Sequence, residues 1–299
     1  MGNEKFHDRG YKALFSHPQM VKELISSFVN EDFIKKIDFT TLKQENASFI
    51  TDDHKSSEAD IIWKVDIQGK PAFIYILIEF QSTVDLFMSV RMLTYILLLY
   101  QHIIKKERLK KLPSVFPVLL YSGDDKWTAP LELNELIDIP FAELRKYIPQ
   151  FRYYKIAENE FTPEGLMELD NLVSSLFLIE TANPEDLSFL IVRILKILSK
   201  EVDIELKRSF SLWLNAKLRI IDVDLGDIKH LDKGGDLSML ETKLKKYRDG
   251  LLEEGMQKGK LEGKLEGIIE SARKMLEYGI KIEEIVKITG LSKEEILGK

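Results

Sequence analysis

A stretch that is apolar on both faces constrains this 299-residue chain more than any other feature. Residues 72–80 carry β-forming side chains at both odd and even positions, whereas a strand with one solvated face alternates between apolar and polar residues. We therefore expect a central strand whose sheet is covered on both sides. A second strand at 60–66 and a turn at 67–71 predict that the two strands form a hairpin.

The segments around this hairpin predict an α/β fold. Apolar residues recur at helical spacing over 11–29 and again over 84–108. Residues 115–121 form another apolar strand, so the helix at 84–108 is expected to cross over from the hairpin to a parallel neighbour. Segment 33–49 is ambiguous and is compatible with an irregular strand, and residues 163–221 are almost entirely helical in pattern.

The composition predicts a globular protein of the cytoplasm. Apolar residues make up 44% of the chain, but the strongest apolar run, 95–100, is far shorter than the roughly 18 residues of a membrane span. The N-terminus lacks the apolar segment of a secretory signal. The absence of cysteine excludes disulfides and thiolate metal sites, and it fits a reducing compartment.

The charge balance of −6 counts against a nucleic-acid ligand, because phosphate contacts normally rely on clustered cations. One local cluster runs against the overall balance, and a local strip is what meets a phosphate backbone. It consists of Lys105, Lys106, Arg108, Lys110 and Lys111. The alternative is a solvated helix end, where cations are favoured by the helix dipole.

Near the C-terminus, Gly255, Gly259, Gly263 and Gly267 recur every four residues in a segment rich in Lys and Glu. A solitary helix loses about 1 kcal/mol per glycine relative to alanine, so a compensating contact is expected. Four-residue spacing aligns the glycines on one helix face, where a second helix could approach closely. We expect a homo-oligomer through this Gly-repeat helix; a charged linker with chance periodicity is the alternative.

Residues 282–296 predict two short helices at the end of the chain. Ser292 is expected to cap the second helix, with Glu295 three residues later completing a capping box. This is a small hairpin of helix-turn-helix type, and a capping or docking element is its alternative interpretation.

Two carboxylates mark the hairpin as a candidate reaction centre. Asp60 opens one strand and Glu79 closes the next, so both lie at the same end of the hairpin. Like charges placed together are explained by a hard cation, and Mg²⁺ prefers one or two carboxylates, water and substrate phosphate oxygens. Gln81, two residues beyond Glu79, shares its face of the strand. The alternative is that these residues are solvated at the rim of the sheet.

Other chemistries lack support in the residues. The five histidines, at positions 7, 17, 54, 102 and 230, show no metal-ligand spacing, so a zinc site is not expected. Neither a GxxxxGK[ST] phosphate loop nor a GxSxG nucleophile turn is present.

Several segments together resemble a known bacterial family, the recombination-promoting nucleases and YhgA-like transposases, or Rpn family. The resemblance covers roughly the first 130 residues and the glycine-rich tail. It is carried by His7, Asp8, Tyr11, Lys12, Leu14 and Phe15; by Ala59, Asp60 and Ile61; by Ile78, Glu79, Phe80, Gln81 and Ser82; by Arg91 and Tyr95; and by residues 117–123 with Trp127.

The resemblance implies a PD-(D/E)XK restriction-endonuclease-like core, a mixed sheet flanked by helices. In that superfamily Asp60 and Glu79 would be metal ligands, with the backbone carbonyl of Phe80 as a possible third. Gln81 stands where the wider superfamily has lysine, and glutamine can orient water but cannot supply positive charge. The implied reaction is Mg²⁺-dependent hydrolysis of DNA phosphodiesters by an endonuclease linked to recombination or transposition, with Mn²⁺ able to substitute.

Five basic or aromatic residues are candidates for contacts to DNA. Lys12, Arg91 and Tyr95 are candidates near the hairpin, and Lys105 and Lys106 belong to the basic strip. For Lys12 the favoured interpretation is an ordinary surface lysine. A helix that packs Tyr95 and pairs Arg91 with a carboxylate would need no phosphate ligand.

We expect a nuclease-like domain over 1–155, a helical region over 156–240 and an oligomerising tail over 241–299. A rival hypothesis is a catalytically weak or inactive nuclease fold that binds DNA or a protein, which the acidic charge and Gln81 both permit. Another is an oligomerisation or regulatory protein whose function resides in the tail.

Overall fold

The described residues of the computed structural model fall into two compact units. One reaches from the N-terminus to residue 183 and includes 189–220, and the other consists mainly of the tail. Only the backbone is described for residues 2–8, 77–79, 188 and 215–220. The structure describes residues 2–45, 61–79, 84–183, 186–198, 203–220, 253, 256–257, 259–260 and 263–297.

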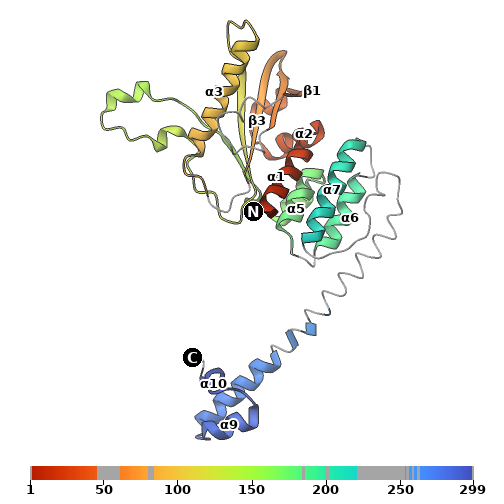
Figure 1. The fold of residues 1–299 in the computed structure, drawn as a ribbon, viewed down its shortest axis with the longest axis vertical. Coiled ribbons are helices and arrows are strands. Elements are labelled where there is room, and N and C mark those ends of the chain that lie inside the picture. Colours follow the sequence, from red (N-terminus) through yellow and green to blue (C-terminus); the bar gives the residue numbers. More distant parts are fainter. Residues whose placement is uncertain are drawn as a thin grey trace. The chain divides into compact units, whose positions relative to one another are not determined.

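The first unit is built on a mixed five-stranded sheet with the strand order β1-β2-β3-β4-β5 (Figure 1). β2 is antiparallel to both β1 and β3, and β4 and β5 run parallel to β3. The strands are β1 (Ile37–Glu45), β2 (Ile61–Ile67), β3 (Lys70–Glu79), β4 (Ser114–Tyr121) and β5 (Tyr154–Ala157). β1 shifts register between Asp38 and Lys43, so the irregular strand expected within 33–49 is confirmed.

The predicted hairpin is confirmed, with β2 and β3 joined through Gln68 and Gly69. Both residues have positive φ, 52° and 74°, which is the backbone of the type I′ turn favoured between antiparallel strands. Ile67 pairs with Lys70 and Ile61 with Ile76. The start of β2 and the end of β3 therefore lie at the same end of the hairpin.

β3 is a central strand, as its apolar pattern predicted. Phe73 and Tyr75 are buried on one side in a core with α3 (Met88–Lys106). On the other side Ile74 is paired with Trp63, whose indole Nε1 donates a hydrogen bond to the carbonyl oxygen of Phe15 at 3.1 Å. Helices thus cover both faces of the sheet, and each face removes a row of β3 side chains from water.

Helix α3 is the crossover between β3 and β4, as predicted, and it covers one face of the sheet (Figure 1). The pattern located the helix but did not identify which stripe faces the core. Its buried residues are Met88, Ser89, Met92, Tyr95, Ile96, Leu99 and Ile103. Four other apolar residues of the segment, Phe87, Val90, Leu97 and Ile104, are exposed.

A helical layer covers the opposite face, where α1 (Gly2–Phe15) contacts β3, and α2 (Pro18–Phe28) contacts β1. The Glu23 carboxylate on α2 accepts hydrogen bonds from the backbone N–H groups of Leu172 and Val173, so α2 caps the start of α5. The remaining helices are α4 (Pro163–Glu168), α5 (Leu172–Thr181), α6 (Leu187–Leu198) and α7 (Ile204–Ile220). In the described part of the chain, no helix is long and apolar enough to cross a membrane.

The tail unit is a helix over 263–277 against which α9 (Ile282–Thr289) and α10 (Lys293–Leu297) pack. Its core is formed by Ala272, Ile285, Leu291 and Ile296. The predicted capping box is confirmed: Ser292 Oγ accepts from the N–H of Glu295 at 3.2 Å, and the Glu295 carboxylate accepts from the N–H of Ser292 at 2.7 Å. The hairpin therefore has a hydrophobic core of its own.

Three of the four spaced glycines, Gly259, Gly263 and Gly267, lie in helical backbone, and Gly255 lies outside the described residues. A Cβ atom placed on any of the three would have nothing within 4 Å among the described atoms. Among the residues that the structure describes, none covers the face formed by these three glycines.

His17 connects the start of α2 to α7, because a hydrogen bond of 3.0 Å joins its Nε2 to the hydroxyl of Ser209. Burial lowers the pKa of His17 below its ordinary value of 6.5, and the nearby carboxylates of Asp203 and Glu205 oppose that shift in part. Folding thus favours the neutral imidazole.

This contact predicts a loss of stability in mild acid. Below pH 6.5 the unfolded chain takes up a proton at His17 more readily than the folded chain, so stability is complete above 6.5 and falls as pH drops through the lowered folded pKa. Thermal unfolding at a series of pH values should show a smaller acid destabilisation for His17→Gln than for the natural chain. Ser209→Ala should lower the melting temperature at every pH while keeping the acid slope; an unchanged slope in His17→Gln would contradict the assignment.

Candidate active site

The C-terminal ends of three parallel strands meet at one edge of the sheet. Glu79, the last residue of β3, is in register with Tyr121 at the end of β4, which is in register with Ala157 at the end of β5. The start of β2 lies at the same edge. In sheets of this kind, ligands bind outside the carboxyl ends of the strands.

The structure places the expected residue Glu79 at this edge, as the final residue of its strand. Its backbone is described and its side chain is not. Asp60, Phe80 and Gln81 lie outside the described residues. Ile61 follows Asp60 directly in the sequence and starts β2, so the strand that Asp60 was expected to open is confirmed.

A buried carboxylate that sequence reasoning missed, Glu158, follows Ala157 at the same edge. Its side chain is 2% exposed. The hydroxyl of Tyr11 on α1 donates to one carboxylate oxygen at 2.8 Å, and the hydroxyl of Ser122 after β4 donates to the other at 2.8 Å. Each oxygen of Glu158 therefore has a hydroxyl donor, which offsets part of the cost of burying a charge.

The burial of Glu158 was not predictable from its neighbours in the sequence. Glu158 lies between Ala157 and the polar pair Asn159 and Glu160, a pattern that is typical of a solvated loop. The strand before it, Tyr154–Ala157, is only four residues long. Its burial comes from Tyr11, which is 147 positions away in the sequence.

Tyr11 remains protonated over the ordinary pH range. Burial is the main cause that raises its pKa well above 10.0, followed by the negative charges of Glu158 and Glu180. A deprotonated Tyr11 would place a third negative charge beside two carboxyl groups. Tyr11 therefore stays available as a hydrogen-bond donor to Glu158.

The loop after β4 is held close to this edge. Asn159 Nδ2 donates to the backbone oxygens of Gly123, Asp124 and Asp125 at 2.8, 3.2 and 3.0 Å. A Cβ atom at Gly123 would lie 2.2 Å from the hydroxyl oxygen of Tyr121, so any larger residue would displace that ring. Asn159 and Gly123 thus fix the loop that carries Ser122.

Arg91 and Tyr95, proposed as phosphate contacts, engage each other within the chain. Arg91 Nε donates to the Tyr95 hydroxyl at 3.3 Å, and its Nη1 lies 3.8 Å from the Asp85 carboxylate. Tyr95 is 3% exposed and stacks on Tyr75 with a centroid separation of 6.3 Å. This arrangement matches the alternative interpretation, a packed tyrosine and an ion-paired arginine.

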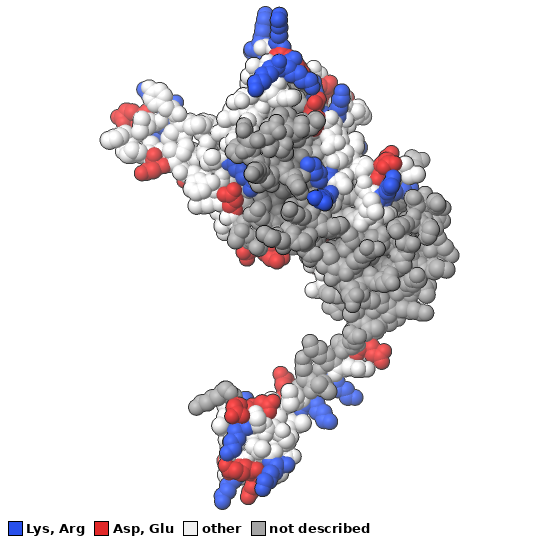
Figure 2. All heavy atoms as spheres, in the orientation of Figure 1, with Lys and Arg blue, Asp and Glu red and all other residues white. Residues whose placement is uncertain are grey.

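The remaining cationic candidates lie in two places. Lys12 is half-buried in the last turn of α1, one residue after Tyr11 in the sequence. Lys105 and Lys106 end α3 and are exposed, with the rest of the strip preceding β4. The start of β4 is in register with Ala72, seven residues from Glu79, which is about 23 Å along a strand. The basic strip, visible as the cluster of cations at the top of Figure 2, is remote from Glu79.

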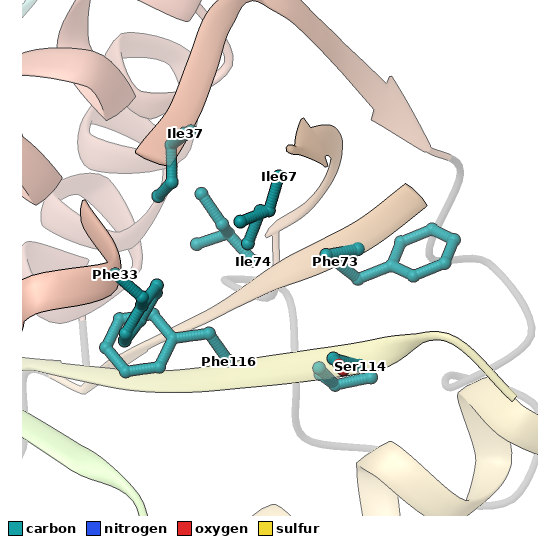
Figure 3. Close-up of a pocket in the computed structure, with 9 residues that line it drawn as sticks. Phe33, Ile37, Ile67, Phe73, Ile74, Ser114 and Phe116 are labelled. Carbon is teal, nitrogen blue, oxygen red and sulfur yellow. The ribbon is translucent and has the colours of Figure 1, made fainter. Parts of the chain in front are cut away.

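An apolar hollow of about 330 Å³ lies at the end of the sheet remote from Glu79. Figure 3 shows Phe33 and Phe116 below Ile37, Ile67 and Ile74, and the two phenyl rings meet edge to face with centroids 5.0 Å apart. Ser114 is the only hydroxyl among its lining residues. The hollow does not suit a phosphate, and it is separate from the candidate reaction centre.

Among the described side chains there is no group of three or more His, Cys, Asp or Glu residues that could hold a metal. The side chains of Asp60 and Glu79 are outside that set. Their expected role as metal ligands stays a prediction.

Comparison with protein families places these features in context. Residues 5–208 match the model of the family described as "Putative transposase, YhgA-like". The chain belongs to this family. The match spans the whole sheet and helices α1 to α7 up to residue 208, and the family is the one that the sequence resemblance indicated.

Among its relatives are three proteins of Escherichia coli. Recombination-promoting nuclease RpnA of strain K12 is 26% identical over 294 residues, which cover 97% of this chain and 95% of RpnA. Recombination-promoting nuclease RpnD of O157:H7 is 31% identical over 117 residues, 39% of this chain and 45% of RpnD. The inactive recombination-promoting nuclease-like protein RpnE of strain K12 is 24% identical over 298 residues, 97% of this chain and 96% of RpnE. No solved structure shows a significant match.

The Tyr11 hydrogen bond to Glu158 predicts a measurable contribution to stability. Tyr11→Phe removes a donor to a buried carboxylate and should lower the free energy of unfolding by about 1.5–3 kcal/mol. Tyr154→Phe is the control without a charged partner, because the Tyr154 hydroxyl donates to the carbonyl oxygen of Phe28 and accepts from the N–H of Asn30, and it should cost about 0.5–1.5 kcal/mol for each of these neutral hydrogen bonds. Denaturant unfolding measures both. Equal losses per hydrogen bond would show that Tyr11 does not stabilise a charge.

Proposed function

We propose that the chain is a metal-dependent DNA endonuclease with a PD-(D/E)XK core, whose reaction centre lies at the Glu79 edge of the sheet. One observation carries the proposal: the end of β3 and the start of β2 meet at the edge where β4 and β5 also end. The names of RpnA and RpnD, which are recombination-promoting nucleases, support a nuclease function. Recombination or transposition is the cellular setting proposed from those names.

Asp60 and Glu79 would hold the metal, with the backbone carbonyl of Phe80 as a third ligand. These are hard oxygen donors, which suit Mg²⁺ and also accept Mn²⁺. The acidic surroundings of Glu158 fit a cation at this edge, because they add negative potential without an exposed competing ligand. A bound Mg²⁺ would lower the pKa of water and polarise the phosphate.

Gln81 would orient the attacking water through its amide, since glutamine both donates and accepts hydrogen bonds. Lys12 is the proposed source of positive charge near the scissile phosphate, because it neighbours Tyr11 on the helix that reaches Glu158. Arg91 and Tyr95 would contact DNA only after exchanging their partners in the chain.

Lys105 and Lys106 would contact backbone phosphates of the duplex at a distance from the scissile bond. Their end of the sheet is about 23 Å from Glu79, a distance that spans about seven base pairs at 3.4 Å each. Binding and cleavage would then depend on different residues, and this separation can be measured.

Supercoiled-plasmid nicking tests the proposal. With Mg²⁺ or Mn²⁺ the natural chain should nick the plasmid, and Glu79→Ala should lose at least 100-fold in rate, about 2.7 kcal/mol or more of transition-state stabilisation. Glu164→Ala, an exposed acid in the first turn of α4, is the control and should cleave normally. Glu79→Ala should still retard DNA in a gel, because the basic strip is unchanged.

Two outcomes would overturn the proposal. A natural chain that leaves DNA intact with every divalent metal, yet retards it in a gel, would favour a binding protein with a nuclease fold. RpnE, which is named as inactive, is similar to 97% of this chain, and this similarity supports the rival hypothesis of a binding protein. Equal cleavage by Glu79→Ala and the natural chain would remove the reaction centre from this edge.

We also propose that the Gly-repeat helix joins copies of the chain, which the bare face of Gly259, Gly263 and Gly267 supports. Replacing Gly263 and Gly267 with Gln should stabilise the isolated helix by about 1 kcal/mol at each position and still weaken self-association. Sedimentation should report a smaller assembly. Lys260→Gln, at an exposed position of the same helix, is the control; an unchanged mass in the double glycine variant would exclude the glycine face.

A further inference from the structure

Helix α3 has a second apolar stripe that its own fold does not use. The stripe faces away from the core formed by Met92, Tyr95 and Leu99. Its residues are Phe87, Val90, Leu97 and Ile104, with exposed fractions of 56%, 43%, 50% and 58%. A contiguous exposed apolar patch on a soluble protein is characteristic of an interaction site.

The spacing of this stripe is that of a helix-packing seam. Val90, Leu97 and Ile104 are each seven residues apart, so they stay aligned on one side of a helix that packs against another. The stripe covers most of the 19-residue helix. A partner that presents a helix along the whole length of α3 fits this pattern better than a compact ligand.

The part of the stripe that lies within α3, from Val90 to Ile104, is complementary to itself, whereas Phe87, which precedes the helix, would meet Glu107 of the other copy. Val90 and Ile104 lie at equal distances on either side of Leu97, so an antiparallel copy of α3 would place Leu97 against Leu97 and each Val90 against an Ile104. A two-fold interface requires this correspondence, because residue i must meet residue j while j meets i. The pattern therefore favours a second copy of the chain as the occupant.

Charge selects the antiparallel orientation. The cations of the basic strip lie within residues 105–111, which we call the basic tip. This tip carries five cations and one carboxylate, and all of its residues are exposed. In a parallel pair the two basic tips would lie together and repel each other. In an antiparallel pair each tip reaches the N-terminal end of the partner's α3.

An acidic feature stands at that N-terminal end. The arm, residues 131–150, leaves the sheet after β4 and projects from it (Figure 1), and its two ends are joined by hydrogen bonds between Leu133 and Phe151 and between Tyr153 and Leu131. The arm contains four carboxylates and two cations. Val84, just before α3, and Leu131 and Phe151, at the base of the arm, pack against the same hydrophobic core. The base of the arm thus lies near the N-terminal end of α3.

The arm and the tip also offer apolar surface to each other. Phe141, Leu144 and Tyr147 are exposed on the arm, and Leu109 and Leu112 are exposed at or beside the tip. Two helices of 19 residues cover only about 28 Å by 10 Å each, roughly 560 Å² in total, whereas stable interfaces bury about 1,200–2,000 Å². Contacts between arm and tip at both ends would supply the additional area.

We propose that two copies of this chain associate through an antiparallel, two-fold pairing of α3 centred on Leu97, with the basic tip of each copy against the acidic arm of the other. This interface is separate from the Glu79 edge and from the Gly-repeat helix. The basic tip includes Lys105 and Lys106, so pairing and the DNA contact proposed above would compete for these two cations. The pairing itself does not depend on whether the chain cleaves DNA.

Single cysteines test the pairing sharply, because the full-length chain contains no cysteine. Leu97→Cys lies on the two-fold axis, where the two Cα atoms can reach the roughly 4.4–6.8 Å that a disulfide needs. Ile104→Cys is the matched control, since it is similarly exposed, but its two copies would lie about 21 Å apart along an antiparallel pair. Air or copper oxidation followed by a non-reducing gel gives the yield of covalent dimer.

Leu97→Cys should form covalent dimer in at least tenfold higher yield than Ile104→Cys, and a chain with both Val90→Cys and Ile104→Cys should match Leu97→Cys. A Leu97→Cys chain that stays monomeric on the gel would overturn the proposal. Equal dimer yields from Leu97→Cys and Ile104→Cys would also overturn it, because they would indicate parallel pairing or random collision. The unmodified tail in every variant keeps any association through the glycines constant.

Discussion

The fold depends on β3 being buried on both faces. Phe73 and Tyr75 pack against α3, while Ile74 and its neighbour in register, Trp63, pack on the side of α1. Such a strand needs a helical layer over each apolar row, and with water excluded it must satisfy its backbone N–H and C=O groups within the sheet. It needs a partner strand on each side, which β2 supplies as a hairpin and β4 supplies after the α3 crossover. The position of the candidate site follows from this arrangement.

Parallel strands end at the same edge, and their polar continuations gather there. Glu79, Ser122 and Glu158 come from three successive strands, and Tyr11 reaches them from the first helix. Burying a carboxyl group is costly unless hydrogen-bond donors surround it, and Glu158 is buried at this edge. The hydroxyls of Tyr11 and Ser122 supply two of those donors. Asn159 holds the loop that carries Ser122 by donating to the backbone oxygen of Gly123. The relatives of this chain include proteins named as nucleases and one named as an inactive nuclease-like protein, so the fold alone does not decide activity.

The elements that the sequence predicted are those whose cause is local. The hairpin turn at Gln68 and Gly69, the β3 pattern, the α3 crossover and the Ser292 cap are each specified within a short window, and each is confirmed. The position of Glu79 at a strand end was predictable for the same reason. Glu158 was not, because its burial depends on a tyrosine near the N-terminus. The buried face of α3 was also beyond the pattern, since this helix carries apolar residues on two sides and only packing selects between them.

The sequence by itself therefore determined the class of fold, the order of the strands around the hairpin and the family. These follow from periodicity, turn chemistry and motif residues that act over a few positions. Only the tertiary structure decided that Arg91 and Tyr95 bind each other, that the basic tip lies at the opposite end of the sheet from Glu79, and that one apolar stripe of α3 remains exposed. Each of these outcomes is set by which surfaces exclude water together, and that depends on contacts between segments far apart in the chain.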